Sequence, residues 1–301
     1  NKRKKSDSEK KNYIPSSNKD ETDINNNLLL KDNIIELKTN LDQNFKINDI
    51  YTYDINLINK MNSGLFESFL FSSNQSINNK DKLVIVNEFI PFTIKNTDNK
   101  DQKYELIPDE DDFLYSSVEE LIEQIKCEVC WVGMIKNFYV QDEVEIMEIE
   151  EFLEEKNIIL VSVNKQQFND YYIYYNNLLM PTFVDNSISS NNQYDIDYLK
   201  YYNAFLLVNR KFSECLINFV RKNDLIMING MNLCFIPNVL YPKRINCRIG
   251  IYSHLCFPSS DVFKAFPNSS DILNSILLCD VIGFHIYNYA RNFQTVLQRV
   301  C

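Results

Sequence analysis

The chain contains little glycine and little histidine: five glycines and two histidines among 301 residues. Glycine makes up about 7 % of an average protein. Loops that cradle phosphate groups with their main-chain amides are built from several closely spaced glycines. The composition therefore argues against a glycine-rich phosphate-binding loop.

Positive charge and long apolar segments are also missing. The formal net charge is −10, whereas surfaces that bind nucleic acid or anionic membranes are basic. No apolar run reaches the roughly 18 residues of a membrane-spanning helix, and no signal peptide is recognisable. We therefore expect no nucleic-acid partner, no membrane association and a cytoplasmic location.

Of the eight cysteines, only Cys127 and Cys130 have the spacing of metal ligands. No second CxxC motif and no pair of histidines completes a zinc site. We interpret these two residues as reduced cysteines of a hydrophobic core. The sequence predicts neither a metal nor a cofactor.

The sequence divides into three parts. Residues 1–30 are rich in Lys, Asn, Ser and Asp without periodicity, which is typical of a disordered tail. Residues 31–80 are Asn-rich with short apolar clusters, and either dock on a domain or remain mobile. Residues 81–301 alternate apolar strands with helical segments, which predicts a Rossmann-like parallel sheet with helices on both faces. Because the chain opens with Asn1 rather than Met, we interpret it as a fragment of a longer product.

Apolar runs mark the expected strands at 81–91, 127–135, 157–163, 224–228, 246–253 and 280–285. Helices are expected at 149–156 and at 198–222, where an apolar residue recurs every three or four positions. Ser117, with Glu120 as the second half of a capping box, predicts another helix start. Ser259 or Ser260 is expected to cap the helix that follows. The aromatic stretch after residue 163 is expected to be a loop.

Ligands bind at the carboxyl ends of the strands in parallel sheets of this kind. Both histidines, His254 and His285, directly follow a predicted strand, and so does the segment Asn229–Asn232. These residues are therefore the first candidates for a functional site.

Two segments resemble motifs of the trehalose-6-phosphate synthases. "YSHLCFPSSDVFKAFP" is similar to their HxPFPSSExxRxLP segment, and "CDVIGFHIYNYARNF" is similar to ADLIGFHTFDYARHF. Weaker likenesses are those of "CWVGMIK", "NLLMPTF" and "NDLIMINGMNLCFIP". Order and spacing agree from Lys82 to Cys301, and the likeness is greatest to plant-type members that lack a glycine-rich donor loop.

The resemblance implies the N-terminal lobe of a two-lobed GT-B glycosyltransferase, with the C-terminal donor lobe absent from this chain. In that family the N-terminal lobe holds glucose 6-phosphate and the C-terminal lobe holds UDP-glucose. Trehalose 6-phosphate forms with retention and without an obligatory metal. The implied partners are these small-molecule substrates and other synthase or phosphatase subunits.

Carried over residue by residue, the resemblance makes His254 the catalytic histidine between the two sugars. It also implies an acceptor-binding set of Tyr171, Met180, Asn229, Gly230, Met231 and Asn232. The alternative for His254 is a structural histidine whose ring nitrogens bond to the backbone. The alternative for Tyr171 is an aromatic core. His285, and the pair Asp261 and Lys264, are interpreted as structural.

Several positions depart from the family pattern. The family's HDYH block is Asn229–Asn232 here, so that its carboxylate is replaced by Gly230. Met180 replaces a tryptophan, and Phe89 stands near the place of an arginine that contacts phosphate. Two functions follow: the acceptor lobe of a synthase, or a catalytically impaired regulatory or scaffolding homologue. A third hypothesis, a nucleotide-binding α/β module, is disfavoured by the scarcity of glycine.

Overall fold

The computed structural model describes residues 82–97, 103–109, 112, 114–119, 127–136, 143–184, 197–243 and 246–300. The predictions for the tail 1–30 and the extension 31–80 lie outside these residues.

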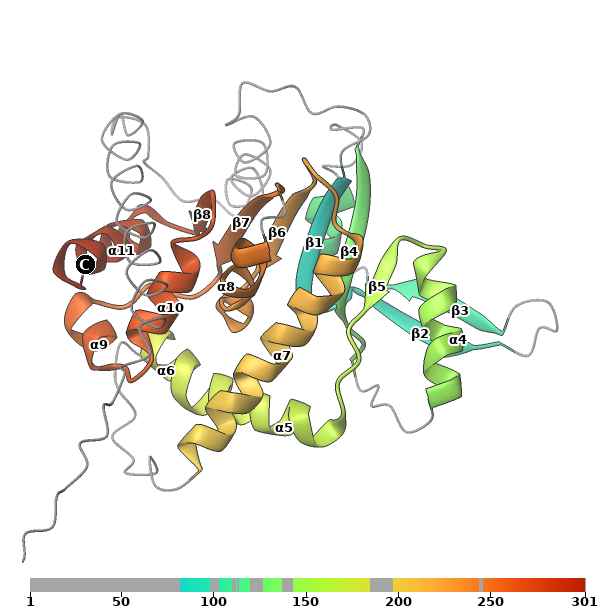
Figure 1. Ribbon diagram of the computed structural model, residues 1–301, viewed down its shortest axis with the longest axis horizontal. Helices are drawn as coiled ribbons and strands as arrows, with labels where there is room; N and C mark the ends of the chain where they lie inside the picture. The colour runs from blue at the N-terminus through green and yellow to red at the C-terminus, as the bar shows by residue number, and fades with distance from the viewer. Residues whose placement is uncertain are drawn as a thin grey trace, which may run out of the picture. The chain divides into compact units, whose positions relative to one another are not determined.

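A six-stranded sheet forms the centre of the described part (Figure 1). All neighbouring strands are parallel, in the order β5-β4-β1-β6-β7-β8. This confirms the predicted parallel sheet. The strands are β1 (Lys82–Phe89), β4 (Glu128–Met134), β5 (Ile158–Leu160), β6 (Leu225–Asn229), β7 (Arg248–Ser253) and β8 (Val281–Phe284).

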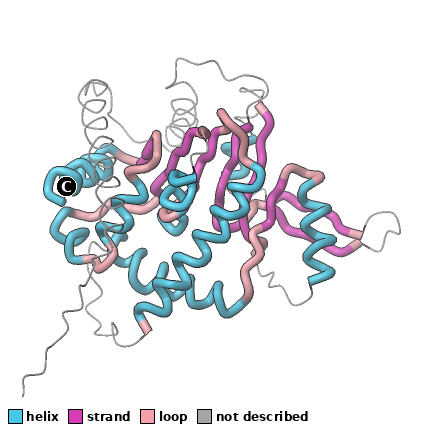
Figure 2. The backbone as a smooth tube through the Cα atoms, in the orientation of Figure 1, coloured by secondary structure: helices cyan, strands magenta, loops and turns pink. Residues whose placement is uncertain are grey.

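Helices connect these strands, and an antiparallel hairpin follows β1 (Figure 2). The hairpin consists of β2 (Phe92–Asn96) and β3 (Tyr104–Pro108). The helices are α4 (Glu143–Glu154), α5 (Lys165–Tyr174), the π-helix η1 (Tyr175–Leu179), α6 (Met180–Val184), α7 (Tyr198–Phe219), the 3-10 helix η2 (Met231–Leu233), α8 (Ile236–Leu240), the 3-10 helix η3 (Tyr241–Lys243), α9 (Ser260–Ala265), α10 (Ser269–Ile276) and α11 (Tyr287–Val300).

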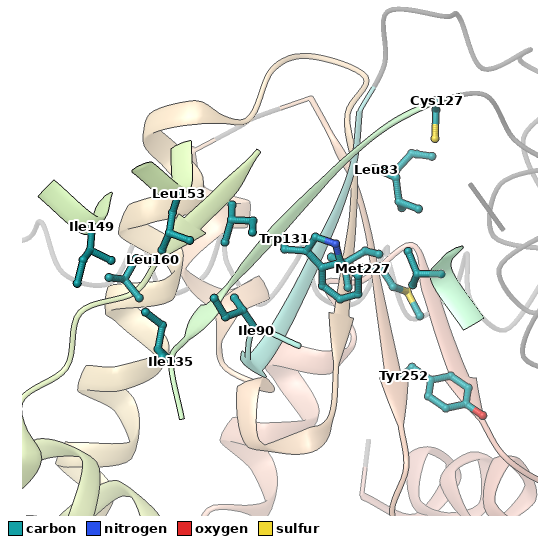
Figure 3. Packing of buried hydrophobic residues seen from close by; sticks show 14 of the residues in the cluster. Leu83, Ile90, Cys127, Trp131, Ile135, Ile149, Leu153, Leu160, Met227 and Tyr252 are labelled. Atoms are coloured by element: carbon teal, nitrogen blue, oxygen red, sulfur yellow. The ribbon is translucent and has the colours of Figure 1, made fainter. Parts of the chain in front are cut away.

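One face of the sheet carries a continuous hydrophobic cluster (Figure 3). Leu83, Trp131, Leu160 and Met227 contribute to it from four strands, and α4 covers it with apolar side chains. Each large apolar side chain buried in this way stabilises the fold by roughly 1.5–3 kcal/mol. Since side chains alternate along a strand, the remaining buried residues of β1 and β6 point to the other face.

Helix α7 crosses the sheet (Figure 1) and confirms the predicted amphipathic helix. Phe205, Val208 and Phe212 are fully buried, while Cys215 and Phe219, which continue the same spacing along the helix, are only partly buried. The spacing of three and four residues thus located the buried face of the helix.

The predicted aromatic loop after residue 163 is wrong, because α5, η1 and α6 occupy this stretch. Asn164 caps α5: its side chain accepts a hydrogen bond from the Gln167 amide, and Gln167 reaches back to the Asn164 amide. The aromatic residues form the packing face, and the Tyr171 and Phe205 rings stack with centroids 5.4 Å apart. The capping box was the signal that could have predicted this helix.

The predicted helix start at Ser117 is also wrong, since residues 114–119 are helical. Asp112 Oδ1 accepts hydrogen bonds from the amides of Leu114 and Tyr115 at 2.9 and 3.1 Å. Asp112 therefore supplies the cap, five residues before the expected position. In contrast, Ser259 is the residue before α9, as expected.

Asp224 joins the amino-terminal ends of three central strands. Its carboxylate accepts hydrogen bonds from the amides of Lys82 (3.0 Å) and Arg221 (2.7 Å), and its carbonyl accepts one from the Arg248 amide (3.0 Å). The residue is only 2 % exposed. A buried carboxylate in this position aligns β1, β6 and β7 at their amino-terminal ends, opposite to the carboxyl ends where ligands are expected.

We expect Asp224→Ala to lower the free energy of unfolding by about 1–3 kcal/mol, because two main-chain donors lose their acceptor in a buried place. Asp224→Asn retains one acceptor oxygen and is expected to lose less. Urea unfolding of the three proteins measures both effects. Equal midpoints for Asp224→Ala and the unchanged protein would contradict this role.

Candidate functional site

The candidate site lies at the carboxyl ends of four neighbouring strands. The parallel register places Asn87 of β1 beside Asn229 of β6, and Asn229 beside Tyr252 of β7. His254 follows β7 and His285 follows β8. Residues that are far apart in the sequence therefore meet at one edge of the sheet.

A directed chain of hydrogen bonds runs through these residues. It ends at the main-chain carbonyl of Phe89, which can only accept, and which receives Asn87 Nδ2 at 2.9 Å. Asn87 Oδ1 then accepts from Asn229 Nδ2 at 3.0 Å. Asn229 Oδ1 is left as the acceptor for His254 Nε2. The carbonyl thus fixes the orientation of both amides.

The same logic fixes the protons of both histidines. Because His254 Nε2 donates to Asn229, the neutral ring of His254 has its lone pair on Nδ1. His285 Nε2 lies 3.1 Å from this atom and donates to it. His285 Nδ1 then accepts from the hydroxyl of Tyr252, 2.9 Å away. Five uncharged side chains thus form one chain of hydrogen bonds, in which every donor points towards the Phe89 carbonyl.

Gly283 leaves room for the ring of Tyr252, its partner across β7 and β8. A Cβ atom at this position would lie 2.4 Å from Tyr252 Cδ2. The ring lies edge-on to His285, with centroids 5.1 Å apart. The Gly283–Phe284–His285 segment therefore supplies both the space for the tyrosine and its hydrogen-bond acceptor.

The pKa of His254 is lowered to about 4, chiefly because its nitrogens lose hydration and secondly because His285 is close. The side chain of His254 as a whole remains exposed. The lowered pKa therefore arises at its two ring nitrogens, which are enclosed by their hydrogen-bond partners. The pKa of His285 is lowered for the first of these reasons. Both imidazoles are neutral at pH 7.

The loop after β7, which carries His254, contacts α11. The loop and the helix belong to the two segments that resemble the family motifs. The side chain of Asn292 in α11 donates to the carbonyl of Phe257 at 2.9 Å, and Cys256 Sγ donates to the hydroxyl of Tyr289 at 2.8 Å. Ser253 Oγ donates to the Leu255 carbonyl at 3.0 Å, just where β7 ends. These contacts give much of both motifs a structural role, which is to position His254.

We predict that His254 and His285 both carry their proton on Nε2 and that His254 stays neutral from pH 8 down to pH 5. Long-range ¹H–¹⁵N correlation spectra measure this directly, and the chain has only two histidines to assign. Since the folded-state pKa of His254 lies below the ordinary value, its contribution to the stability of the fold is lost as the pH falls from about 6.5 towards 4. An Nδ1-protonated His254, or a pKa near 6.5, would contradict the chain.

A second polar cluster lies beside the first, and one of its members, Glu88, was not predicted from the sequence. Glu88, next to Asn87 on β1, lies beside Tyr171 of α5 and Asn232 of η2. Loss of hydration raises the pKa of Glu88 to about 7, although interactions with Tyr171 and Asn232 act in the opposite direction. Glu88 Oε1 and the Tyr171 hydroxyl are buried, and among the described residues neither makes a well-aligned hydrogen bond.

Gly230 begins the segment that carries Asn232. Its φ of 106° lies in a region that L side chains rarely adopt. A Cβ atom at Gly230 would lie 2.4 Å from Asn232 Oδ1. The amide of Asn232 therefore occupies the space that any larger residue at position 230 would need.

The structure separates the predicted acceptor-binding residues into groups. Asn229 belongs to the hydrogen-bonded chain, and Tyr171 and Asn232 belong to the Glu88 cluster. Met231 is 2 % exposed and packs in the core. Met180 is 37 % exposed at the start of α6. The alternative of an aromatic core also applies to Tyr171, which is fully buried and stacked on Phe205.

Glu88→Gln is predicted to stabilise the protein at pH 8. The raised pKa means that the folded state binds the proton more tightly than the unfolded state. Ionisation of this carboxyl therefore lowers the free energy of unfolding as the pH rises from about 4.5 to 7. A shift of this size corresponds to about 3 kcal/mol. The difference in unfolding free energy between Glu88→Gln and the unchanged protein should therefore grow between pH 5 and pH 8.

Urea unfolding at both pH values measures this difference, and Glu105→Gln on the exposed side of β3 is the matched control. If Glu88→Gln and Glu105→Gln show the same pH dependence, Glu88 is not a buried titrating carboxyl.

Cys127 and Cys130 are free and buried, and burial raises the pKa of Cys130 to about 12. This confirms their interpretation as core thiols. Across the described ranges no group of three His, Cys, Asp or Glu residues is arranged to hold a metal ion. Within the same ranges, no helix has both the length and the apolar character needed to cross a bilayer.

A parallel α/β sheet with polar residues at its carboxyl edge defines a Rossmann-like lobe. Residues 81–301 match the family model of glycosyltransferase family 20, and the chain belongs to this family.

Curated relatives include a probable alpha,alpha-trehalose-phosphate synthase (UDP-forming) 2 of Arabidopsis thaliana, 29 % identical, and alpha,alpha-trehalose-phosphate synthase (UDP-forming) A of Dictyostelium discoideum, 28 % identical. Both alignments cover 73 % of this chain. They cover 26 % and 28 % of the relatives, so that the chain spans about a quarter of their length.

Solved structures share the fold. The N-terminal domain of trehalose-6-phosphate phosphatase from Candida albicans aligns with a TM-score of 0.61 and 22 % identity, over 76 % of this chain and 44 % of that one. An alpha,alpha-trehalose 6-phosphate synthase from Burkholderia multivorans aligns with a TM-score of 0.55 and 18 % identity, over 73 % and 43 %. At these identities the likeness establishes the fold alone.

Proposed function

We propose that this chain is the acceptor-side lobe of a trehalose-6-phosphate synthase-like glycosyltransferase, which transfers glucose from UDP-glucose to glucose 6-phosphate in the cytoplasm. The observation that carries the proposal is the gathering of His254 and Asn229 with the Glu88 cluster at one edge of the sheet. In a family 20 protein this edge is where a sugar is expected.

His254 is the proposed catalytic residue, and Tyr171, Met180, Asn229, Gly230, Met231 and Asn232 are the proposed acceptor-binding residues. A neutral imidazole is suited to hydrogen-bond a sugar hydroxyl while charge develops at the anomeric carbon. Both nitrogens of His254 are bonded to protein side chains. A sugar hydroxyl that binds this ring therefore replaces either Asn229 or His285 as its partner.

The second candidate function is a catalytically impaired homologue that senses a sugar phosphate or pairs with an active synthase or phosphatase subunit. Two observations favour it. Gly230 supplies no carboxylate, and the amide of Asn232 fills the space beside it. The occurrence of the fold in both a synthase and the N-terminal domain of a phosphatase means that the fold does not decide between the two functions.

UDP release by the intact gene product from UDP-glucose and glucose 6-phosphate decides between the two candidates. For a synthase, we expect release that falls about a hundredfold or more in His254→Ala. No release from a protein that is folded by circular dichroism, with saturable binding of glucose 6-phosphate, would establish the regulatory function. The 301-residue chain alone is expected to be inactive in either case.

A further inference from the structure

The Glu88 cluster holds two buried polar atoms whose hydrogen-bonding capacity is not used among the described residues: Glu88 Oε1 and the hydroxyl of Tyr171. Burial of such atoms without partners is unfavourable, because they lose their hydrogen bonds to water. Native proteins rarely keep them unless a ligand or water completes the bonds. Glu88 as a whole remains partly exposed at the ligand edge, although this oxygen is turned inward.

The hydrogen-bonding chemistry of the two atoms restricts which ligand group can bind to both of them. The carboxylate oxygen accepts, whereas the phenol of Tyr171 stays protonated because its pKa is raised; it lies beside Glu88 and Asn232 but makes no well-aligned hydrogen bond to either. A hydroxyl group satisfies both at once, since it donates and accepts. A phosphate group would be repelled by the carboxylate, and an ammonium group offers the phenol no acceptor.

We propose that Glu88 is a ligand-binding residue that, together with Tyr171 and Asn232, holds hydroxyl groups of a sugar at the carboxyl end of β1. The inference rests on the proposed function only for the choice of glucose 6-phosphate as a probe. In this proposal the carboxylate of the site is that of Glu88 on β1. It takes the place of a carboxylate at position 230, after the neighbouring strand β6, where the residue is glycine. Asn232 contributes its amide from the adjoining turn of η2.

Binding to the full 301-residue chain tests the proposal, with glucose 6-phosphate and unphosphorylated glucose as the two probes in NMR titrations. Glu88→Gln has almost the same shape as the native residue but loses the charge, and it is expected to weaken binding of both sugars about tenfold or more. Tyr171→Phe removes only the hydroxyl and is expected to weaken both as well. Glu105→Gln, on β3, is the matched control and should bind like the unchanged chain.

The two probes separate this inference from the proposed function. If both sugars bind and both weaken in Glu88→Gln, the inference is supported. If glucose binds through Glu88 but the phosphate adds no affinity, the Glu88 site stands and glucose 6-phosphate is not its acceptor. If Glu88→Gln binds as tightly as the control, only a water molecule or nothing occupies the site, and the inference is overturned. If neither sugar binds, the inference is overturned, whereas the proposed function is still decided by UDP release from the intact gene product.

Discussion

The parallel pairing of β1, β6, β7 and β8 determines where the polar groups at the carboxyl ends of these strands lie. Parallel strands end at the same edge, so that the residues following each strand are brought together whatever their distance in the sequence. The alternation of side chains then divides the edge in two, because Asn87 and Glu88 are neighbours on β1 and point to opposite faces. Asn87 joins the histidine chain, and Glu88 joins Tyr171 and Asn232.

One main-chain carbonyl, that of Phe89, gives the histidine chain its direction. Every group in the chain is neutral, which is consistent with the lowered pKa values of both histidines. An uncharged, fully bonded His254 is well positioned but is not free. Binding of a sugar to this ring must therefore exchange one hydrogen bond for another, whereas binding at Glu88 completes bonds that are open. The two clusters thus differ in whether their hydrogen-bonding atoms are already paired.

The sequence predicted the strands because their apolar runs are continuous, and it predicted α7 because its apolar residues recur at helical spacing. It did not predict α5, because the capping box of Asn164 and Gln167 precedes an aromatic stretch without helical periodicity. It placed a helix start at Ser117, although Asp112 makes the cap. His254 and Asn229 were named from the strand ends and from resemblance.

The burial of Glu88 cannot be predicted from the sequence, since within "KLVIVNEF" it has the pattern of an ordinary polar residue at the end of a strand. Its burial depends on α5 and η2, which approach β1 from elsewhere in the chain. The contact between His254 and His285 likewise depends on the pairing of β7 with β8.

A crystal structure of the intact gene product with glucose 6-phosphate tests the central claim most directly. The account predicts sugar hydroxyls within hydrogen-bond distance of both Glu88 and Tyr171, with His254 still bonded to His285 or Asn229 through at least one nitrogen. A sugar bound away from Glu88, with a water molecule bridging the carboxylate and Tyr171, would contradict it.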